Sequence, residues 1–191
     1  MIELTREEAI KIVPVVAAVM VAVLGWLITY FHKWYFDRRA NKLDRVNRQL
    51  RELYGPLYAR LMAGNSAWEA FWNKHRPVHG KNSYFEGGAQ VTEKEKEVWR
   101  TWMINVFEPY NAEIENLILK NIDLLDSDKI PQSFIAALAH IAAYKAVLAD
   151  WKVGDFSNHV SVNKWPSKEL LSMVEPEYAK LKSMQRGLLG K

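Results

Sequence analysis

The feature that most constrains this chain is a stretch of twenty uncharged residues near its start, residues 12–31, with the sequence IVPVVAAVMVAVLGWLITYF. A helix rises 1.5 Å per residue, so such a stretch extends about 30 Å, the thickness of the hydrocarbon core of a bilayer. Long runs of bulky apolar residues occur nowhere else in the 191 residues. We therefore expect a single-span membrane protein with one soluble domain of about 160 residues.

The same stretch is interpreted as an uncleaved anchor and not as a secretory signal peptide. It is longer than the apolar region of about 7–15 residues that such a peptide contains. Glu3, Glu7 and Glu8 precede it, so a basic opening region is missing. Trp26 and Tyr30 lie near its end, where a cleavage site needs small residues.

Basic residues are concentrated on one side of the stretch. Arg6 and Lys11 precede it, and only Asp37 and Asp44 oppose the basic residues that follow it. The positive-inside rule therefore predicts an outside N-terminus and a cytoplasmic C-terminal domain. The basic residues that follow are Lys33, Arg38, Arg39, Lys42, Arg45, Arg48 and Arg51.

Aromatic and basic side chains at the end of the stretch are typical of a membrane interface. Amphipathic rings favour the headgroup level, and the basic side chains lie within reach of anionic lipid heads. We assign the N-terminal tail, the transmembrane helix and this interfacial belt to residues 1–36, and the cytoplasmic helical domain to residues 37–191. The candidate interface residues are Trp26, Tyr30, Lys33, Trp34, Arg38 and Arg39.

Small residues form a stripe along the stretch. Ala18, Ala22 and Gly25 follow one another at spacings of four and three, which lets helices approach closely in lipid. Thr29 is the one polar side chain, so the wall of any pore built from several copies would be apolar and would gate by dewetting. Pro14 is expected in the first helical turn, where its missing N–H costs little.

Apolar residues recur at three- and four-residue spacing through the remaining chain, which predicts an all-α fold: one N-terminal transmembrane helix followed by a cytoplasmic helical bundle. Pro56 is expected to kink the first bundle helix near residues 52–54. Thr92 and Glu95 form a capping box that starts another helix. Pro109 is expected to begin a new turn or helix after it, and Pro176 to restart a short helix that Ser167 caps.

Residues 132–150 are expected to form the most apolar helix of the soluble part. Its apolar face carries Phe134, Leu138, Ile141 and Leu148, and alanines fill the other faces. A helix that is apolar nearly all round is buried. Both a central bundle helix and an oligomer interface agree with this pattern.

Residues 75–90 form the one long irregular stretch, and we expect a loop that is either functional or mobile; in the adaptor hypothesis below it would be the docking element. His75 and His79 are four apart, but Pro77 between them opposes the helix that would align them as metal ligands. We expect no metal and no cofactor. The chain has no cysteine, no phosphate-binding loop and no recognised catalytic motif, so an enzyme is not expected. A basic face with Arg45, Arg48, Arg51 and Arg60 is more often solvated than bound to nucleic acid.

The chain resembles a group of short bacterial single-span membrane proteins with an LYGPLY signature. The resemblance rests on RVNRQLRELYGPLYARL (45–61), W-x-x-F-W (68–72) and FEPYNAEIENLILKNIDLL (107–125). More loosely, the chain is similar to the membrane-anchored accessory protein of type VI-B CRISPR systems. The resemblance implies the bacterial inner membrane, ring-like homo-oligomers and a pore that adds to antiviral defence. No arginine stands five to seven residues before a histidine, so the RNA-cleavage motif of that accessory protein is missing.

Two functions follow as hypotheses. The first is a homo-oligomeric inner-membrane effector that forms a pore or perturbs the membrane, with the bilayer and further copies of itself as partners. The second is a membrane-tethered adaptor that recruits a cytoplasmic protein without permeabilising the membrane.

Overall fold

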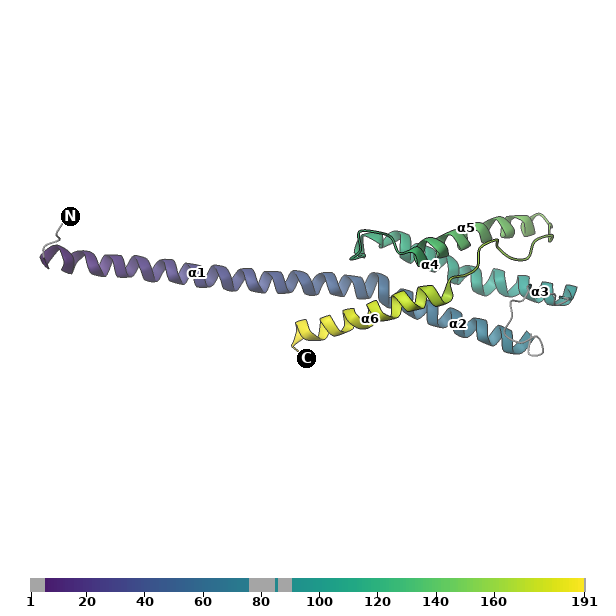
Figure 1. Cartoon of the computed structure of the whole chain (residues 1–191), viewed down its shortest axis with the longest axis horizontal. Helices are drawn as coiled ribbons and strands as arrows, with labels where there is room; N and C mark the ends of the chain where they lie inside the picture. Colours follow the sequence, from purple (N-terminus) through teal and green to yellow (C-terminus); the bar gives the residue numbers. More distant parts are fainter. Residues whose placement is uncertain (1–5, 76–84, 86–90, 191) are drawn as a thin grey trace. The chain divides into compact units, whose positions relative to one another are not determined.

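A computed structural model describes residues 6–75, 85 and 91–190 of the chain. Every regular element in that part of the chain is helical, which confirms the predicted all-α class. Contacts divide the chain into two compact units, Met1–Asp44 and Arg45–Lys191. Figure 1 labels the α-helices of both units.

The first unit is formed by helix α1, Arg6–Arg48, whose last residues belong to the second unit. Its side chains from residue 14 to residue 36 are exposed, apart from the half-buried Leu27. Pro14 lies inside the helix, so its predicted place in the first turn is wrong. The helix begins earlier because the preceding REEAIK segment consists mainly of good helix formers.

The second unit, the helical domain, consists of short and long helices that pack side by side. Helix α2 packs against α4 and α6, and α5 packs against the same two helices. After the end of α1, its elements are the π-helical turn η1 (Gln49–Tyr54), α2 (Gly55–His75), α3 (Glu93–Trp102), the π-helical turn η2 (Met103–Phe107), α4 (Glu108–Lys120), the 3₁₀ turn η3 (Ile122–Leu124), α5 (Gln132–Lys152) and α6 (Ser167–Leu189).

The LYGPLY segment forms the junction between η1 and α2. Pro56 has no N–H, so it leaves the carbonyl of Glu52 without its helical donor. The side chain of Asn121 donates to that carbonyl from Nδ2 at 2.8 Å. Gly55 donates to the carbonyl of Leu50, and a Cβ on Gly55 would overlap that oxygen. The irregularity thus falls where Pro56 predicts one, and it takes the form of a π-helical turn.

Two other prolines have different outcomes. Helix α3 ends at Trp102, the π-helical turn η2 follows, and α4 begins at Glu108 with Pro109 in its first turn, so the prediction that Pro109 begins a new helix is confirmed. Helix α6 continues through Pro176, so the predicted restart of a short helix is wrong. Leu170, Val174 and Leu181 are buried on one face of α6. Their packing holds both halves of the helix in line although one backbone hydrogen bond is missing.

Helix caps agree with the sequence at one position and not at another. At α3 the Thr92 side chain accepts from the Glu95 N–H, and the Glu95 carboxylate accepts from the Thr92 N–H, which confirms the capping box. At α6 the capping position is Pro166. Ser167 donates its hydroxyl to Asn65 Oδ1 at 2.8 Å instead, so its predicted role as N-cap is wrong.

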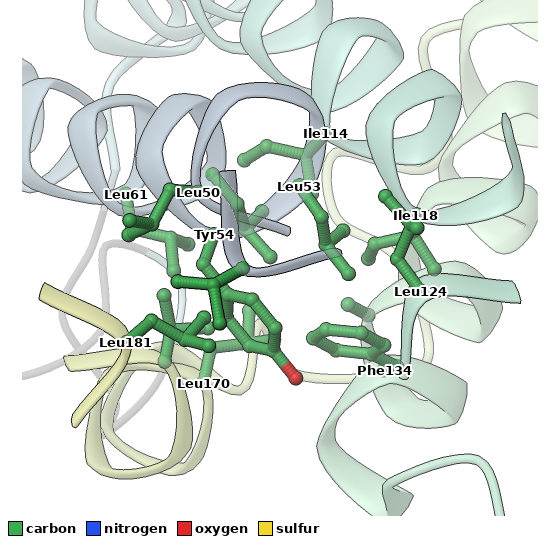
Figure 2. Close-up of a cluster of buried hydrophobic side chains, with 14 residues drawn as sticks. Leu50, Leu53, Tyr54, Leu61, Ile114, Ile118, Leu124, Phe134, Leu170 and Leu181 are labelled. Atoms are coloured by element: carbon green, nitrogen blue, oxygen red, sulfur yellow. The ribbon is translucent and has the colours of Figure 1, made fainter. Parts of the chain in front are cut away.

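A first core cluster lies where η1, α2, α4, α5 and α6 meet (Figure 2). Leu53, Leu57, Ile118, Phe134 and Leu170 are fully buried in it. Burying one side chain of this size is worth about 1.5–3 kcal/mol, so this cluster accounts for much of the stability of the domain.

A second core cluster is aromatic and lies at the other end of α2 and α5. Phe71, Trp72, Trp99, Tyr144 and Trp151 are buried in it, with Met103 and Val147 between them. The chain is rich in tryptophan, and this cluster uses several of the eight. The two clusters together leave a pocket at their boundary.

Candidate functional site

The candidate site is a pocket of about 410 Å³ in the helical domain. Leu61 and Ile114 of the first core cluster and Trp99, Met103 and Tyr144 of the second line it. A volume of this size lies in the range of about 300–1,000 Å³ in which small-molecule sites fall. The pocket therefore has the size and the position, between two packed cores, of a binding site for one small ligand.

Aromatic rings form a large part of its wall. The ring centroids of Trp68, Trp99 and Phe107 lie 5.8–6.0 Å from one another. Phe85 lies 5.7 Å from Trp99 and stacks on His159 at 5.2 Å. Rings at these distances hold one another in fixed orientations, and their remaining faces offer flat apolar surface to a ligand.

Residues 153–166, the connector between α5 and α6, form one side of the pocket. Four side chains form hydrogen bonds with backbone carbonyls of this connector. Trp99 Nε1 and Tyr144 Oη both donate to the carbonyl of His159, at 2.7 and 2.8 Å. Trp151 Nε1 donates to the carbonyl of Asn158 at 2.7 Å. Because buried N–H and O–H groups need partners, these bonds anchor the aromatic core and shape the connector at once.

His140 makes the fourth of these bonds, and it also lines the pocket. Its Nδ1 lies 2.6 Å from the carbonyl oxygen of Asn163. A carbonyl only accepts, so Nδ1 carries the proton and Nε2 is the acceptor of the neutral ring. Burial lowers the pKa of His140, although the bond to Asn163 opposes this shift. The neutral ring therefore predominates near pH 7.

Further polar groups line the pocket at its margin. Asn65 accepts a hydrogen bond from Ser167, which leaves the amide N–H₂ side of Asn65 as a donor. Arg60 and Lys164 are basic, and Arg60 contacts the carboxylate of Glu113 through Nε. The described lining residues include no Asp and no Glu. The pocket thus combines a flat apolar interior with a basic and amide margin.

A second groove of about 530 Å³ lies beside α3, η2 and α5. It presents both signs of charge, since Glu97 and Glu108 line it together with Arg100 and Lys152. The guanidinium of Arg100 covers the ring of Phe156, with 4.3 Å between them. Within the described part of the chain, no group of three His, Cys, Asp or Glu side chains is arranged to hold a metal ion. Of the two hollows, we take the aromatic pocket as the candidate site, because contacts between its rings fix its wall.

The predicted small-residue stripe lies on the exposed part of α1. Ala18, Ala22, Gly25 and Thr29 are all exposed, and a Cβ on Gly25 would have no heavy atom within 4 Å. Thr29 Oγ1 donates to the carbonyl of Gly25 at 2.8 Å. The hydroxyl of Thr29 is therefore satisfied within its own helix.

The predicted interface residues also lie on α1. The rings of Trp26 and Tyr30 stack at 5.6 Å, and the guanidinium of Arg38 lies 4.3 Å from the ring centroid of Trp34. Lys33 is exposed and Arg39 is half-buried. Rings and cations thus alternate along this part of the helix.

The residues predicted on the apolar face of α5 fall in both cores. Phe134 and Ile141 are buried, and Leu138 is half-buried against the first core cluster. Leu148 is half-buried against the second core cluster. His140 and Tyr144 on the same helix line the pocket, and neither of them was predicted to belong to a site. The high tryptophan content was the one signal that pointed to an aromatic site.

The predicted docking loop, residues 75–90, lies outside the described residues except for His75 and Phe85. His75 ends α2, and its ring lies 5.3 Å from that of Phe71. Phe85 lines the pocket. The prediction that Pro77 keeps His75 and His79 from aligning as metal ligands is not tested, because His79 is not among the described residues.

The arginines of the predicted basic face each contact a carboxylate. Arg45 lies 3.1 Å from Asp126, and Arg51 lies 2.7 Å from Glu52. Arg48 lies 3.8 Å from both Glu52 and Asp123, and Arg60 contacts Glu113. Acidic neighbours thus offset the charge of this face.

Comparisons with protein-family models, with characterised proteins and with solved structures find no match for the chain.

Proposed function

We propose that the chain is a membrane-tethered binding protein. The apolar part of α1 anchors it in a bilayer, and the aromatic pocket of the helical domain binds a small cytoplasmic molecule. The observation that carries the binding role is the pocket itself, which joins flat aromatic walls to a few polar groups. This proposal keeps the membrane tether of the adaptor hypothesis, but the bound partner is a small molecule in the pocket and not a recruited cytoplasmic protein.

The anchoring role is supported by the exposed apolar surface of α1. Twelve large apolar side chains between residues 12 and 31 are exposed. About half of each is accessible, so covering them is worth on the order of 10–20 kcal/mol. That gain is as large as the whole folding free energy of an ordinary domain, about 5–15 kcal/mol. A bilayer supplies this cover without any protein partner.

The topology is testable because the natural chain has no cysteine. Two variants, Glu3→Cys and Ser183→Cys, each carry a single cysteine that a membrane-impermeant maleimide can label. Labelling shows on which side of the membrane each cysteine lies. We expect Glu3→Cys to react in intact spheroplasts and Ser183→Cys to react only after lysis. Reaction of Ser183→Cys in intact spheroplasts, or release of the chain from membranes by alkaline carbonate, would contradict the proposed anchor.

The binding role is testable with a residue that opens onto the pocket. Gly64 lines the pocket, and a Cβ on it would have no heavy atom within 4 Å, so Gly64→Leu adds bulk there without a clash. Gly187→Leu on α6 is the matched control, because its Cβ also meets open space and it does not line the pocket. We expect 1-naphthylacetate to bind the full chain in detergent, measured by calorimetry. Gly64→Leu should abolish this binding and Gly187→Leu should not. Equal binding by all three proteins would contradict the role of the pocket in binding.

A second candidate function is the homo-oligomeric effector that perturbs the membrane as part of antiviral defence. The open surface at Gly25 favours it, since small residues let two helices approach closely in lipid. The internal bond of Thr29 argues for an apolar pore wall that gates by dewetting. The defence role rests on the resemblance to the LYGPLY proteins alone.

Self-association decides between the two functions. If the effector function holds, the detergent-solubilised chain is an oligomer, and Gly25→Leu or Ala22→Leu reduces it to a monomer and abolishes membrane depolarisation on expression. Val21→Leu is the control, because Val21 is exposed and lies outside the stripe. A strict monomer at every concentration would exclude the effector function and leave the binding function intact.

A further inference from the structure

The proposed binding function leaves the ligand undefined, and the pocket restricts its shape. Trp68, Trp99 and Phe107 present ring surfaces whose mutual distances fix their orientation. Planar ring systems stack on such surfaces with offset or edge contacts, whereas flexible chains gain less from them. The walls therefore favour a planar aromatic ligand.

The margin of the pocket restricts the charge of the ligand. Arg60 and Lys164 line it, and no Asp or Glu is among the described lining residues. Glu113 contacts Arg60, but a guanidinium has five N–H donors, more than one carboxylate engages. Arg60 also lies beside the ring of Tyr110, at 5.7 Å from its centroid, which keeps its planar group next to the aromatic wall. A cation placed beside an aromatic surface suits a ligand whose ring carries a negative substituent.

Two polar side chains of the pocket, His140 and Asn65, can form hydrogen bonds with the edge of a ligand ring. The neutral ring of His140 offers Nε2 as an acceptor, and Asn65 offers amide N–H groups as donors. Tyr144 and Trp99 direct their own polar atoms to the connector, so they contribute only ring surface.

Resting on the proposed binding function, we infer that the ligand is a planar aromatic molecule with an anionic substituent, its ring against the wall that Trp68, Trp99 and Phe107 form and its anion beside Arg60 and Lys164. A ligand of this class is a single small molecule, because the pocket encloses about 410 Å³. A heteroaromatic ring with a donor and an acceptor on its edge matches His140 and Asn65 best.

A charge series on one ring tests the inference. The probes are 1-naphthylacetate, 1-naphthylacetamide and 1-naphthylmethylamine, which carry an anion, no charge and a cation on the same ring. We expect the full chain in detergent to bind the acetate roughly tenfold more tightly than the amide, the effect of about one charge-assisted hydrogen bond, and to bind the amine most weakly. Calorimetry gives the three dissociation constants.

Two substitutions test whether the preference for the anionic probe comes from Arg60 and Lys164. Arg60→Gln and Lys164→Gln together should remove the difference in affinity between acetate and amide. Lys168→Gln is the matched control, since Lys168 is an exposed lysine four residues beyond Lys164 that does not line the pocket. Thermal unfolding of each variant shows that the fold persists.

The outcomes separate the inference from the binding function. Equal binding of acetate and amide, or a preference that survives Arg60→Gln with Lys164→Gln, overturns the inference and leaves pocket binding intact. Failure of all three probes to bind, or binding that Gly64→Leu does not affect, contradicts the binding function as well.

Discussion

Helices α1 and α5 both contain a long apolar stretch, but they differ in how much of that stretch is buried. Both are long and apolar enough to cross a membrane, with mean hydropathy of 2.1 and 1.3 in their most apolar 18-residue windows. No residue of the α1 window is buried, whereas 28% of the α5 window is. The difference teaches that the distribution of bulky side chains around a helix, more than the apolar total, decides what covers it.

The arrangement of side chains explains the contrast. On α5 the bulky residues Phe134, Ile141, Tyr144, Val147 and Trp151 are buried, and the exposed positions include four alanines at 139, 142, 146 and 149. Alanine exposes little apolar area, so that face tolerates water. On α1, bulky residues surround the helix, and no face is suited to water.

The largest expected effect comes from the buried side of α5. Phe134→Ala leaves a cavity in the first core cluster and should lower the free energy of unfolding by about 3–5 kcal/mol. Ile135→Ala, at an exposed neighbouring position, should cost less than about 1 kcal/mol. Denaturant unfolding of the full chain in detergent measures both. Equal losses would mean that α5 is not packed as described.

A lysine introduced into each helix compares how α1 and α5 tolerate a charge. Val23→Lys places an ammonium on the apolar part of α1 and should oppose membrane insertion by about 2.5–3.5 kcal/mol. Ala142→Lys places the same charge on the exposed face of α5 and should change neither insertion nor stability. The carbonate-resistant fraction of the expressed chain reports insertion. Unchanged insertion of Val23→Lys would argue against a span at this position.

A smaller effect on stability is expected from substitutions that remove a side-chain hydrogen bond within either unit. Asn121→Ala removes the donor to the Glu52 carbonyl and should cost about 1–3 kcal/mol of unfolding free energy. In a Pro56→Ala background the cost should fall, because the introduced alanine supplies a backbone N–H to that carbonyl. Thr29→Val should be nearly neutral, since the Thr29 hydroxyl bonds only within its own helix. An equal cost of Asn121→Ala in both backgrounds would contradict the proposed role of Asn121.

The smallest effect is a pH dependence confined to the helical domain. Burial lowers the pKa of His75, His140 and His159 below the ordinary value of 6.5. The unfolded chain therefore binds protons first as the pH falls below about 6.5, and stability decreases until the folded pKa values are reached. The melting temperature should thus be lower at pH 5 than at pH 7.5, and His140→Gln should reduce the difference. A melting temperature that rises toward pH 5 would contradict the direction of these shifts.

Sequence patterns predicted the helices well and their junctions poorly. Periodic apolar residues and the Thr92 capping box predict local structure, because their effect is confined to one or two turns. Pro176 predicts a restart by the same local logic, but the packing of α6 overcomes that preference. The role of Asn121 depends on a carbonyl 69 positions away, which no local pattern reveals.

The aromatic pocket was not predictable for a related reason. Trp68, Trp99, Tyr144 and Trp165 come from separate helices and a connector, and only tertiary packing brings them together. Their individual spacings are those of ordinary core residues. The stripe of Ala18, Ala22 and Gly25, by contrast, is visible in the sequence because it lies on one helix.

The most direct test of the account is hydrophobic photolabelling of the full chain in lipid vesicles. A carbene probe confined to the acyl region, followed by mass spectrometry of peptides, compares α1 and α5 in one experiment. We predict label within residues 12–36 and none within Gln132–Lys152. Label on Gln132–Lys152 as strong as on residues 12–36, or no label on residues 12–36, would contradict the account.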